Sequence, residues 1–541
     1  MALALFSPFH LLPLEVKELW SKGVKPIVRN SLTLNLSTCK ACQPVNLSTH
    51  QLYLNQHDMT PLAILATVLA YFAVLFLVSG LARRNVDNAA FFTGSRQSKW
   101  YMVAFAMIGA SISGVTYVSV PGMVAQSGFG YLQLVLGFIA GQLIVAFVLT
   151  PLFYRLQLTS VYEYLRNRFG QQAYHTGAWF FFISKMLGAA VRLFLVCFTL
   201  QLLAFGPLGI PFWVNVALSV GCVWFYTHKG GVKSVIWADL IKTACLIVSV
   251  ALCIWFIADD LQLSFGGVVS HISQSDMSRM FFFDDVNNKQ FFFKQFFAGI
   301  FTTIAMTGLD QDMMQRNLSC RNSRESQKNM VISILLQFIV VAAFLMLGVL
   351  LYEEAARHGL TATGDQLFPT IATGGLLPGV VGVLFIVGLS ASAYNAAGSA
   401  LTALTTSFTV DILGAGKRSE DEVTRMRKRV HVGMAVVMGL SIIVFNILNN
   451  TSVVDAVYTL ASYTYGPILG LFAFGILIKR PVRDRWIPLV ALASPLLCWV
   501  LDRHSEAWFN GYHFSYELLI LNALFTFMGL CLLIKRGTCP Q

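Results

Sequence analysis

Two apolar stretches of this chain are interrupted by small and hydroxyl residues. Residues 109–122 read GASISGVTYVSVPG, and residues 299–311 read GIFTTIAMTGLDQ. Such residues favour a break in a membrane-spanning helix, where freed backbone carbonyls and side-chain hydroxyls offer the oxygen ligands that a hard cation such as Na⁺ needs. One such cluster is explained by close packing of helices. Two clusters at matching positions indicate a site for a solute and an ion.

The composition places these stretches in a membrane. Apolar types make up 56% of the 541 residues and charged types only 12%, whereas a soluble domain carries about 25% charged residues. Apolar runs of about 20 residues recur, which is the length that crosses a bilayer core as a helix. We therefore expect an all-α polytopic protein of the plasma membrane. Basic loops beside the spans explain the net charge of +12, so nucleic acid is not an expected partner.

The apolar runs divide the chain into about thirteen transmembrane helices. With the N-terminus outside and the C-terminus inside, about 25 basic residues fall in cytoplasmic segments and about five in external loops, as the positive-inside rule requires. This asymmetry supports an odd number of spans, with the loop 412–429 inside and the loop 259–289 outside. The predicted spans are residues 60–82, 100–126, 131–153, 172–200, 210–228, 234–258, 290–310, 330–352, 378–411, 430–448, 454–478, 486–502 and 515–534.

The beginning of the chain differs from the rest. Residues 1–58 contain apolar patches but no complete span. The first apolar patch is not preceded by the basic segment that is typical of a signal peptide. We expect a loosely ordered, dispensable external tail, or an extension of a chain that naturally starts at Met59. Residues 59–541 are one predicted domain. Because the two interrupted spans are an odd number of spans apart, its halves form an inverted repeat. The domain comprises an extra helix, two repeats and two final helices, at residues 60–82, 100–258, 290–478 and 486–534.

Several motifs, in this order and spacing, resemble the sodium:solute symporter family. They are DNAAFFTGSRQSKW, ISGVTYVSVPG, TSVYEYLRNRFG, GGVKSVIWADLIK, TGLDQDMMQRNLSCRN, SALTALTTSFTVDIL and YTYGPILGLFAFGILIKR. The likeness covers roughly residues 60–535. It implies a LeuT-like five-plus-five inverted repeat and inward solute transport driven by the sodium gradient. The family carries sugars, amino acids, carboxylates, vitamins and inorganic anions, so the resemblance does not identify the solute.

The resemblance also implies a sodium site, with departures. Matched by motif, backbone carbonyls near Gly109 and Ile112 would hold the ion. The hydroxyl pair that the family places opposite them falls on Asn395 and Ala396, of which Asn395 alone offers an oxygen. Ser392 and Ser399 lie about one turn away on either side, and we expect them to compensate.

A lysine stands where relatives carry glutamine, three residues after an aspartate. Lys242 follows Asp239 and lies about 12 Å along the predicted helix from its start, at 1.5 Å per residue. Its simplest role is an ion pair with Asp239 on the same helix face. The alternative is that its ammonium replaces the sodium ion, which would allow sodium-independent or proton-coupled transport.

The expected solute contacts lie at the two breaks and on a later span. Thr116 matches a family substrate position, with bonding to its own helix as the alternative. Tyr463 and Tyr465 would line the side of the cavity formed by span 454–478, with packing as the alternative. Asp310 and Gln311 stand where relatives often carry Asn-Gln, and capping of the broken helix is their alternative role. Asp310 hints at a polyol, a sugar or an amine-bearing solute. Arg192 would pair with an acidic group or, alternatively, with an anionic solute.

Other functional classes fit the sequence less well. A channel is disfavoured because no pore loop is present, and a transporter-like sensor because the chain ends shortly after the last predicted span. An enzyme is not expected, since HExxH and GxSxG are absent and His and Cys do not cluster. No cofactor is expected beyond the coupling ion, Na⁺ or alternatively H⁺. The expected partners are a small solute and the bilayer, with the chain a monomer or weak oligomer.

Overall fold

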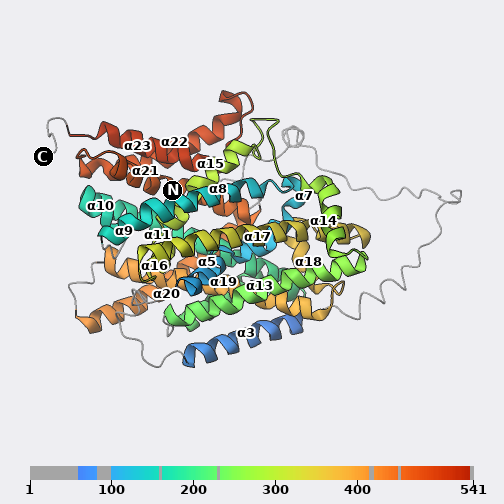
Figure 1. Cartoon of the computed structure of the whole chain (residues 1–541). Coiled ribbons are helices and arrows are strands. Elements are labelled where there is room, and N and C mark those ends of the chain that lie inside the picture. The colour runs from blue at the N-terminus through green and yellow to red at the C-terminus, as the bar shows by residue number, and fades with distance from the viewer. Residues whose placement is uncertain are drawn as a thin grey trace, which may run out of the picture.

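The computed structural model describes residues 59–81, 99–156, 161–227, 232–413, 419–448 and 452–535. The regular elements of these ranges are helices, and none of their residues forms a strand. Most of the long helices run side by side as one bundle (Figure 1). The expected tail, residues 1–58, lies outside the described residues.

Every predicted span overlaps a helix. Eight described helices are long and apolar enough to cross a membrane, and nine if one bent pair counts as a single span. The full count of thirteen and the orientation stay predictions. The helices are α3 (Pro61–Leu81), α5 (Trp100–Ser111), α6 (Gly114–Gly122), α8 (Tyr131–Ile144), α9 (Thr150–Leu156), α11 (Gln171–Leu200), α12 (Phe212–Thr227), α13 (Val232–Asp260), α15 (Phe292–Thr303), α16 (Gln311–Leu318), α17 (Ser323–Arg357), α19 (Gly379–Ser407), α20 (Glu420–Leu448), α21 (Val453–Leu477), α22 (Ile487–Trp508) and α23 (Leu518–Leu532).

The first predicted break separates α5 from α6. The two helices meet at an angle of 53°, because Ile112 and Ser113 leave the helical conformation with ψ of 96° and 171°. Ile112 donates its N–H to the carbonyl of Ile108, 2.8 Å away, and closes the last turn of α5. A helix end leaves its last carbonyls without partners inside the helix, so the break exposes backbone oxygens inside the bundle.

The second predicted break follows α15. A π-helical turn, η6 (Ile304–Gly308), continues α15, and Asp310 is extended with ψ of 123° before α16 begins. The Asp310 Oδ1 atom accepts hydrogen bonds from the N–H groups of Asp312 and Met313, at 2.9 and 3.1 Å. Asp310 is therefore the N-cap of α16, which satisfies two donors that the break would leave unpaired.

Small residues let the broken helices approach their neighbours. A Cβ atom on Gly299 of α15 would lie 2.2 Å from the carbonyl oxygen of Leu134 in α8, so the two backbones are in contact there. On the other side of the bundle α13 packs on α19, and α11 lies against both α19 and α21. Between α17 and α19 the chain forms a short hairpin of η7 (Gly364–Gln366) and α18 (Leu367–Thr373), which packs on α6. Together these contacts enclose a space between the two breaks.

Candidate functional site

A cavity of about 140 Å³ lies between the two broken spans. Its walls come from α5, α6, α8, α11, α15, η6, α16, α17 and α21, so both predicted repeats contribute. We call it the central cavity. Its volume suits a small solute, since pockets for drug-sized ligands begin at about 300 Å³. Its polar lining residues are Ser111, Ser113, Thr116, Tyr131, Gln142, Ser184, Lys185, Arg192, Thr302, Thr303, Thr307, Asp310, Ser333, Gln337, Tyr458 and Tyr465.

The acid at the second break is fully partnered. Both oxygens of Asp310 lie 3.2 Å from the Nζ atom of Lys185 on α11. The Tyr465 hydroxyl on α21 donates to the Asp310 Oδ2 atom at 2.8 Å, in addition to the two backbone donors of the cap. Asp310 is 3% exposed and Lys185 8%, so this is a buried ion pair at the base of the cavity. Lys185 also lies 3.3 Å from Asp312.

Arg192 is the remaining cation of the cavity wall. It lies about two turns beyond Lys185 on the same helix, close enough to Tyr458 and Tyr465 for its charge to act on both phenols. The expected pairing with an acidic group is not present: among the described residues, no carboxylate forms an ion pair with Arg192. With Asp310 balanced by Lys185, the cavity carries the uncompensated positive charge of Arg192.

Two tyrosines from different repeats bind each other in the wall of the cavity. The hydroxyls of Tyr131 on α8 and Tyr458 on α21 lie 2.7 Å apart in a hydrogen bond, and both residues line the cavity. The Tyr458 ring packs on the ring of Tyr516, with centroids 5.0 Å apart. These contacts join α8 of the first repeat to α21 and to the segment that precedes α23.

A buried hydroxyl faces the first break from α19. Ser392 is fully buried, and its Oγ atom has no hydrogen-bond partner among the described residues. A Cβ atom on Gly114, the first residue of α6, would lie 3.8 Å from this oxygen. An unpaired buried hydroxyl is costly, and here it lies beside backbone carbonyls freed at a helix break. The oxygens around Gly109, Ile112 and Ser392 fit a hard cation such as Na⁺.

The other predicted cation residues are placed differently. Ser399 is partly exposed and seven residues from Ser392, about 10 Å along α19, so both hydroxyls cannot reach one ion at the break. The side chains of Asn395 and Asp239 lie outside the described parts of the structure. Lys242 is 2% exposed and is absent from the described lining of the central cavity.

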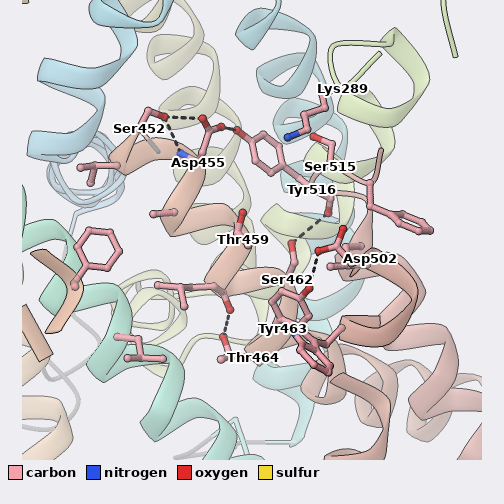
Figure 2. Close-up of a pocket in the computed structure, with 18 of the residues that line it drawn as sticks. Lys289, Ser452, Asp455, Thr459, Ser462, Tyr463, Thr464, Asp502, Ser515 and Tyr516 are labelled. Atoms are coloured by element: carbon pink, nitrogen blue, oxygen red, sulfur yellow. Dashed lines mark hydrogen bonds between the residues drawn. The ribbon is translucent and has the colours of Figure 1, made fainter. Parts of the chain in front are cut away.

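Two predicted solute contacts point away from the central cavity. Gln311 uses its side-chain oxygen to accept a hydrogen bond from the N–H of Val161 at 2.7 Å. Tyr463 donates to Asp502 at 2.9 Å on the far side of α21, and the two side chains point toward each other in Figure 2. Tyr463 and Asp502 line a larger vestibule of about 2110 Å³, whose described lining does not include Gln311. Of the predicted contacts, the structure brings Thr116, Asp310 and Tyr465 to the central cavity.

Sequence reasoning did not assign several residues of this cavity. Lys185 carries a charge inside an apolar run, which by itself marks it as functional or paired. Tyr131 and Tyr458 give no such indication, because tyrosines are frequent in these spans and their partners are distant in sequence. Tyr465 was expected on the side of span 454–478 and lies in the cavity lining. The placement of all three tyrosines depends on packing between α8, α11 and α21.

The fold and the site together define a secondary transporter of the LeuT-like class: an all-helical bundle with two broken spans around a small polar cavity. The sequence profile of the sodium:solute symporter family matches residues 91–484. The chain belongs to the sodium:solute symporter family, and it is an integral multi-pass membrane protein.

Individual relatives agree with this assignment. The human sodium/iodide cotransporter is 26% identical over 432 residues, which cover 75% of this chain and 65% of the relative. The mouse sodium-coupled monocarboxylate transporter 2 is 23% identical, with 75% and 67% covered. The chain thus spans about two thirds of the length of these relatives, which are transporters rather than enzymes. A substrate-bound, outward-open Na⁺-coupled sialic acid symporter has a similar fold, with a TM-score of 0.72, 19% identity and coverage of 87% of this chain and 97% of that chain.

Proposed function

We propose that this protein carries a small anion into the cell, driven by the sodium gradient. The observation that carries the proposal is Arg192, a guanidinium in the wall of the central cavity without a carboxylate partner among the described residues. A guanidinium offers paired N–H donors that match a carboxylate, and it stays charged at all physiological pH values.

The balance of charge in the cavity argues against the solutes that Asp310 alone suggested. Asp310 is occupied by Lys185, Tyr465 and two backbone donors, so little of its acceptor capacity is left for an amine or a sugar hydroxyl. An anion beside Arg192 would neutralise the site. The relatives support this class of solute, because iodide, monocarboxylates and sialic acid are all anions.

The coupling ion is proposed to bind at the break between α5 and α6. The carbonyls near Gly109 and Ile112 would hold the ion from one side, and the Ser392 hydroxyl, which lies near Gly114 and has no partner among the described residues, would hold it from the other. An ion here would join α19 to both halves of the broken span, next to cavity-lining Ser113 and Thr116. Sodium binding would thereby favour the arrangement of α6 that the solute needs.

The experiment is uptake by proteoliposomes that contain the purified full-length protein. Iodide, short monocarboxylates, sialic acid and a neutral sugar are each offered with an inward sodium gradient and in choline buffer. We expect sodium-stimulated uptake of at least one anion and none of the sugar. Uptake of the sugar without competition from any anion would contradict the proposal. Ser392→Ala should raise the sodium concentration at half-maximal uptake, whereas Ser441→Ala, which removes an exposed hydroxyl of α20, should not.

A further inference from the structure

A second polar cluster lies between the central cavity and the vestibule. Ser119 follows cavity-lining Thr116 by three residues, which is about one helical turn of α6. Asp455 lies on the first turn of α21, between the cavity-lining residues Val454 and Val457. Asp365 belongs to η7, and it lines the vestibule together with Ser119 and Asp455. Three separate segments of the chain therefore bring polar side chains to the part of the vestibule lining that adjoins α6 and α21.

Two oxygens of this cluster are buried and unpaired. Ser119 is 1% exposed, and neither its Oγ atom nor the Asp365 Oδ1 atom has a hydrogen-bond partner among the described residues. The other carboxylate oxygen of Asp365 accepts a hydrogen bond of 3.2 Å from the N–H of Val453. The Ser119 hydroxyl lies near enough to stabilise the Asp365 charge, although it does not form a well-directed hydrogen bond. Buried unpaired oxygens are costly, and they indicate a ligand.

The two carboxylates lie near enough for their charges to interact, and Asp365 has no basic partner among the described residues. Asp455 accepts hydrogen bonds from the hydroxyls of Tyr516 and Ser452, as Figure 2 shows. The Asp455 charge acts on Asp365, and no lysine, arginine or histidine of the described residues is among the groups that act on it. Burial raises the pKa of Asp365 above its ordinary value, and the neighbouring Asp455 adds to the effect. Acids in this arrangement require a cation or a proton.

We propose that Ser119, Asp365 and Asp455 form an external sodium site, separate from the one at the break between α5 and α6. All the donors are carboxylate or hydroxyl oxygens, which a hard cation prefers. Tyr516 and Ser452 already occupy both oxygens of Asp455 in part, so the cluster offers few free oxygens. This favours a singly charged ion over Ca²⁺, which takes six to eight oxygen ligands.

An ion at this position would fasten the outer hairpin to the two repeats. The hairpin already touches α6 closely: a Cβ atom on Gly122 would lie 2.2 Å from the carbonyl oxygen of Gly364, and Tyr352 binds both residues, donating to Gly122 at 2.5 Å and accepting from Gly364 at 3.1 Å. The ion would also offset two negative charges on the route of the anion. This last step rests on the proposed function, and it implies that sodium binds before the solute.

Equilibrium binding of radioactive sodium to the purified full-length protein, without solute, tests the site. We expect Asp365→Asn and Ser119→Ala each to remove one sodium ion per chain, so that the amount bound falls by half. Asp285→Asn, which removes an exposed acid from the same vestibule, should bind as much as the wild type. Ser119→Ala is the safer variant for folding, because it deletes a hydroxyl that has no partner.

The outcomes separate this inference from the proposed function. If Asp365→Asn and Ser119→Ala bind as much sodium as the wild type while Ser392→Ala binds less, the external site is wrong and the site at the break stands. If Ser392→Ala binds as much sodium as the wild type and Asp365→Asn binds less, the external site stands and the proposed site at the break is wrong.

Discussion

Lys185 on α11 lies 3.2 Å from both carboxylate oxygens of Asp310, at the break of the second repeat. The pair joins the middle of one repeat to the broken span of the other, inside the wall of the central cavity. Because it balances Asp310, the charge that a solute meets is that of Arg192. The same pair fixes the position of α16, whose first N–H groups bind Asp310.

Removing one partner of the Lys185–Asp310 pair should lower the free energy of unfolding strongly, whereas replacing both partners should lower it little. Asp310→Asn keeps a good helix cap but leaves the lysine charge buried, which we expect to lower the free energy of unfolding by about 3–5 kcal/mol. Lys185→Met combined with Asp310→Asn should recover most of this loss. Thermal unfolding of the purified protein gives the comparison. Glu163→Gln breaks an exposed pair with Arg166 and should cost at most about 1 kcal/mol; an equally small effect of Asp310→Asn would refute the argument.

Arg192 should govern the affinity for the solute rather than for sodium. Arg192→Gln removes a charge-assisted hydrogen bond worth about 1.5–3 kcal/mol, a loss of roughly 10- to 150-fold in apparent affinity for the anion. Arg192→Lys should fall between, because lysine keeps the charge but loses the paired donors. Uptake at varied solute concentration measures the effect. The control is Arg357→Gln, which removes a half-exposed arginine from outside the cavity. Unchanged affinity in Arg192→Gln would remove the basis for an anionic solute.

The orientation can be tested at the start of α20. The positive-inside rule places the basic loop 412–429 in the cytoplasm and the loop 259–289 outside. A cysteine at position 420 should therefore react with a membrane-impermeant reagent only after permeabilisation, and one at exposed position 285 should react in intact cells. A background without the natural reactive cysteines supplies the control. Labelling of position 420 from outside would overturn the thirteen-span arrangement.

The sequence predicted the breaks well because their cause is local. Small and hydroxyl residues cluster at both breaks, at residues 109–122 and just before Asp310. They end the helices through their own backbone preferences, whatever the packing of the neighbouring helices. Thr116 and Asp310 were found for the same reason, since each lies within a turn of a break. The long apolar runs likewise predicted a helix at every span, although α17 and α20 begin seven and ten residues before the predicted spans 330–352 and 430–448.

The sequence did not predict which face of the buried helix α21 points into the central cavity. Tyr463 and Tyr465 lie two residues apart, so their side chains point in nearly opposite directions. Tyr465 reaches Asp310, whereas Tyr463 reaches Asp502 in the vestibule. Because α21 is apolar on all sides and largely buried, the sequence pattern gives no preferred face. The partners of Lys185 depend in the same way on which side chains α16 and its cap bring to α11.

Lys242 lies at the depth of the proposed sodium site. Leu246 of α13 packs on Gly388 of α19, where a Cβ atom would be 3.1 Å from the Leu246 Cδ2 atom. The two helices are predicted to cross the membrane in opposite directions, so Lys242 and Ser392, each four residues from that contact and on its cytoplasmic side, lie at the same level. An ammonium a few ångströms from Na⁺ in a partly dry site would repel it strongly.

Sodium symport and replacement of the sodium ion by the Lys242 ammonium predict opposite effects of sodium on uptake. Since the family is sodium-coupled, we expect strong, saturable sodium stimulation in the wild type. Lys242→Gln should keep that stimulation and lower the sodium concentration at half-maximal uptake, because the repulsion is gone. Uptake in sodium and choline buffers at matched pH measures both, with Lys289→Gln, an exposed lysine of the external loop, as the control. If the wild type shows no sodium stimulation and Lys242→Gln abolishes uptake, the ammonium replaces the ion and the coupling proposed here is wrong.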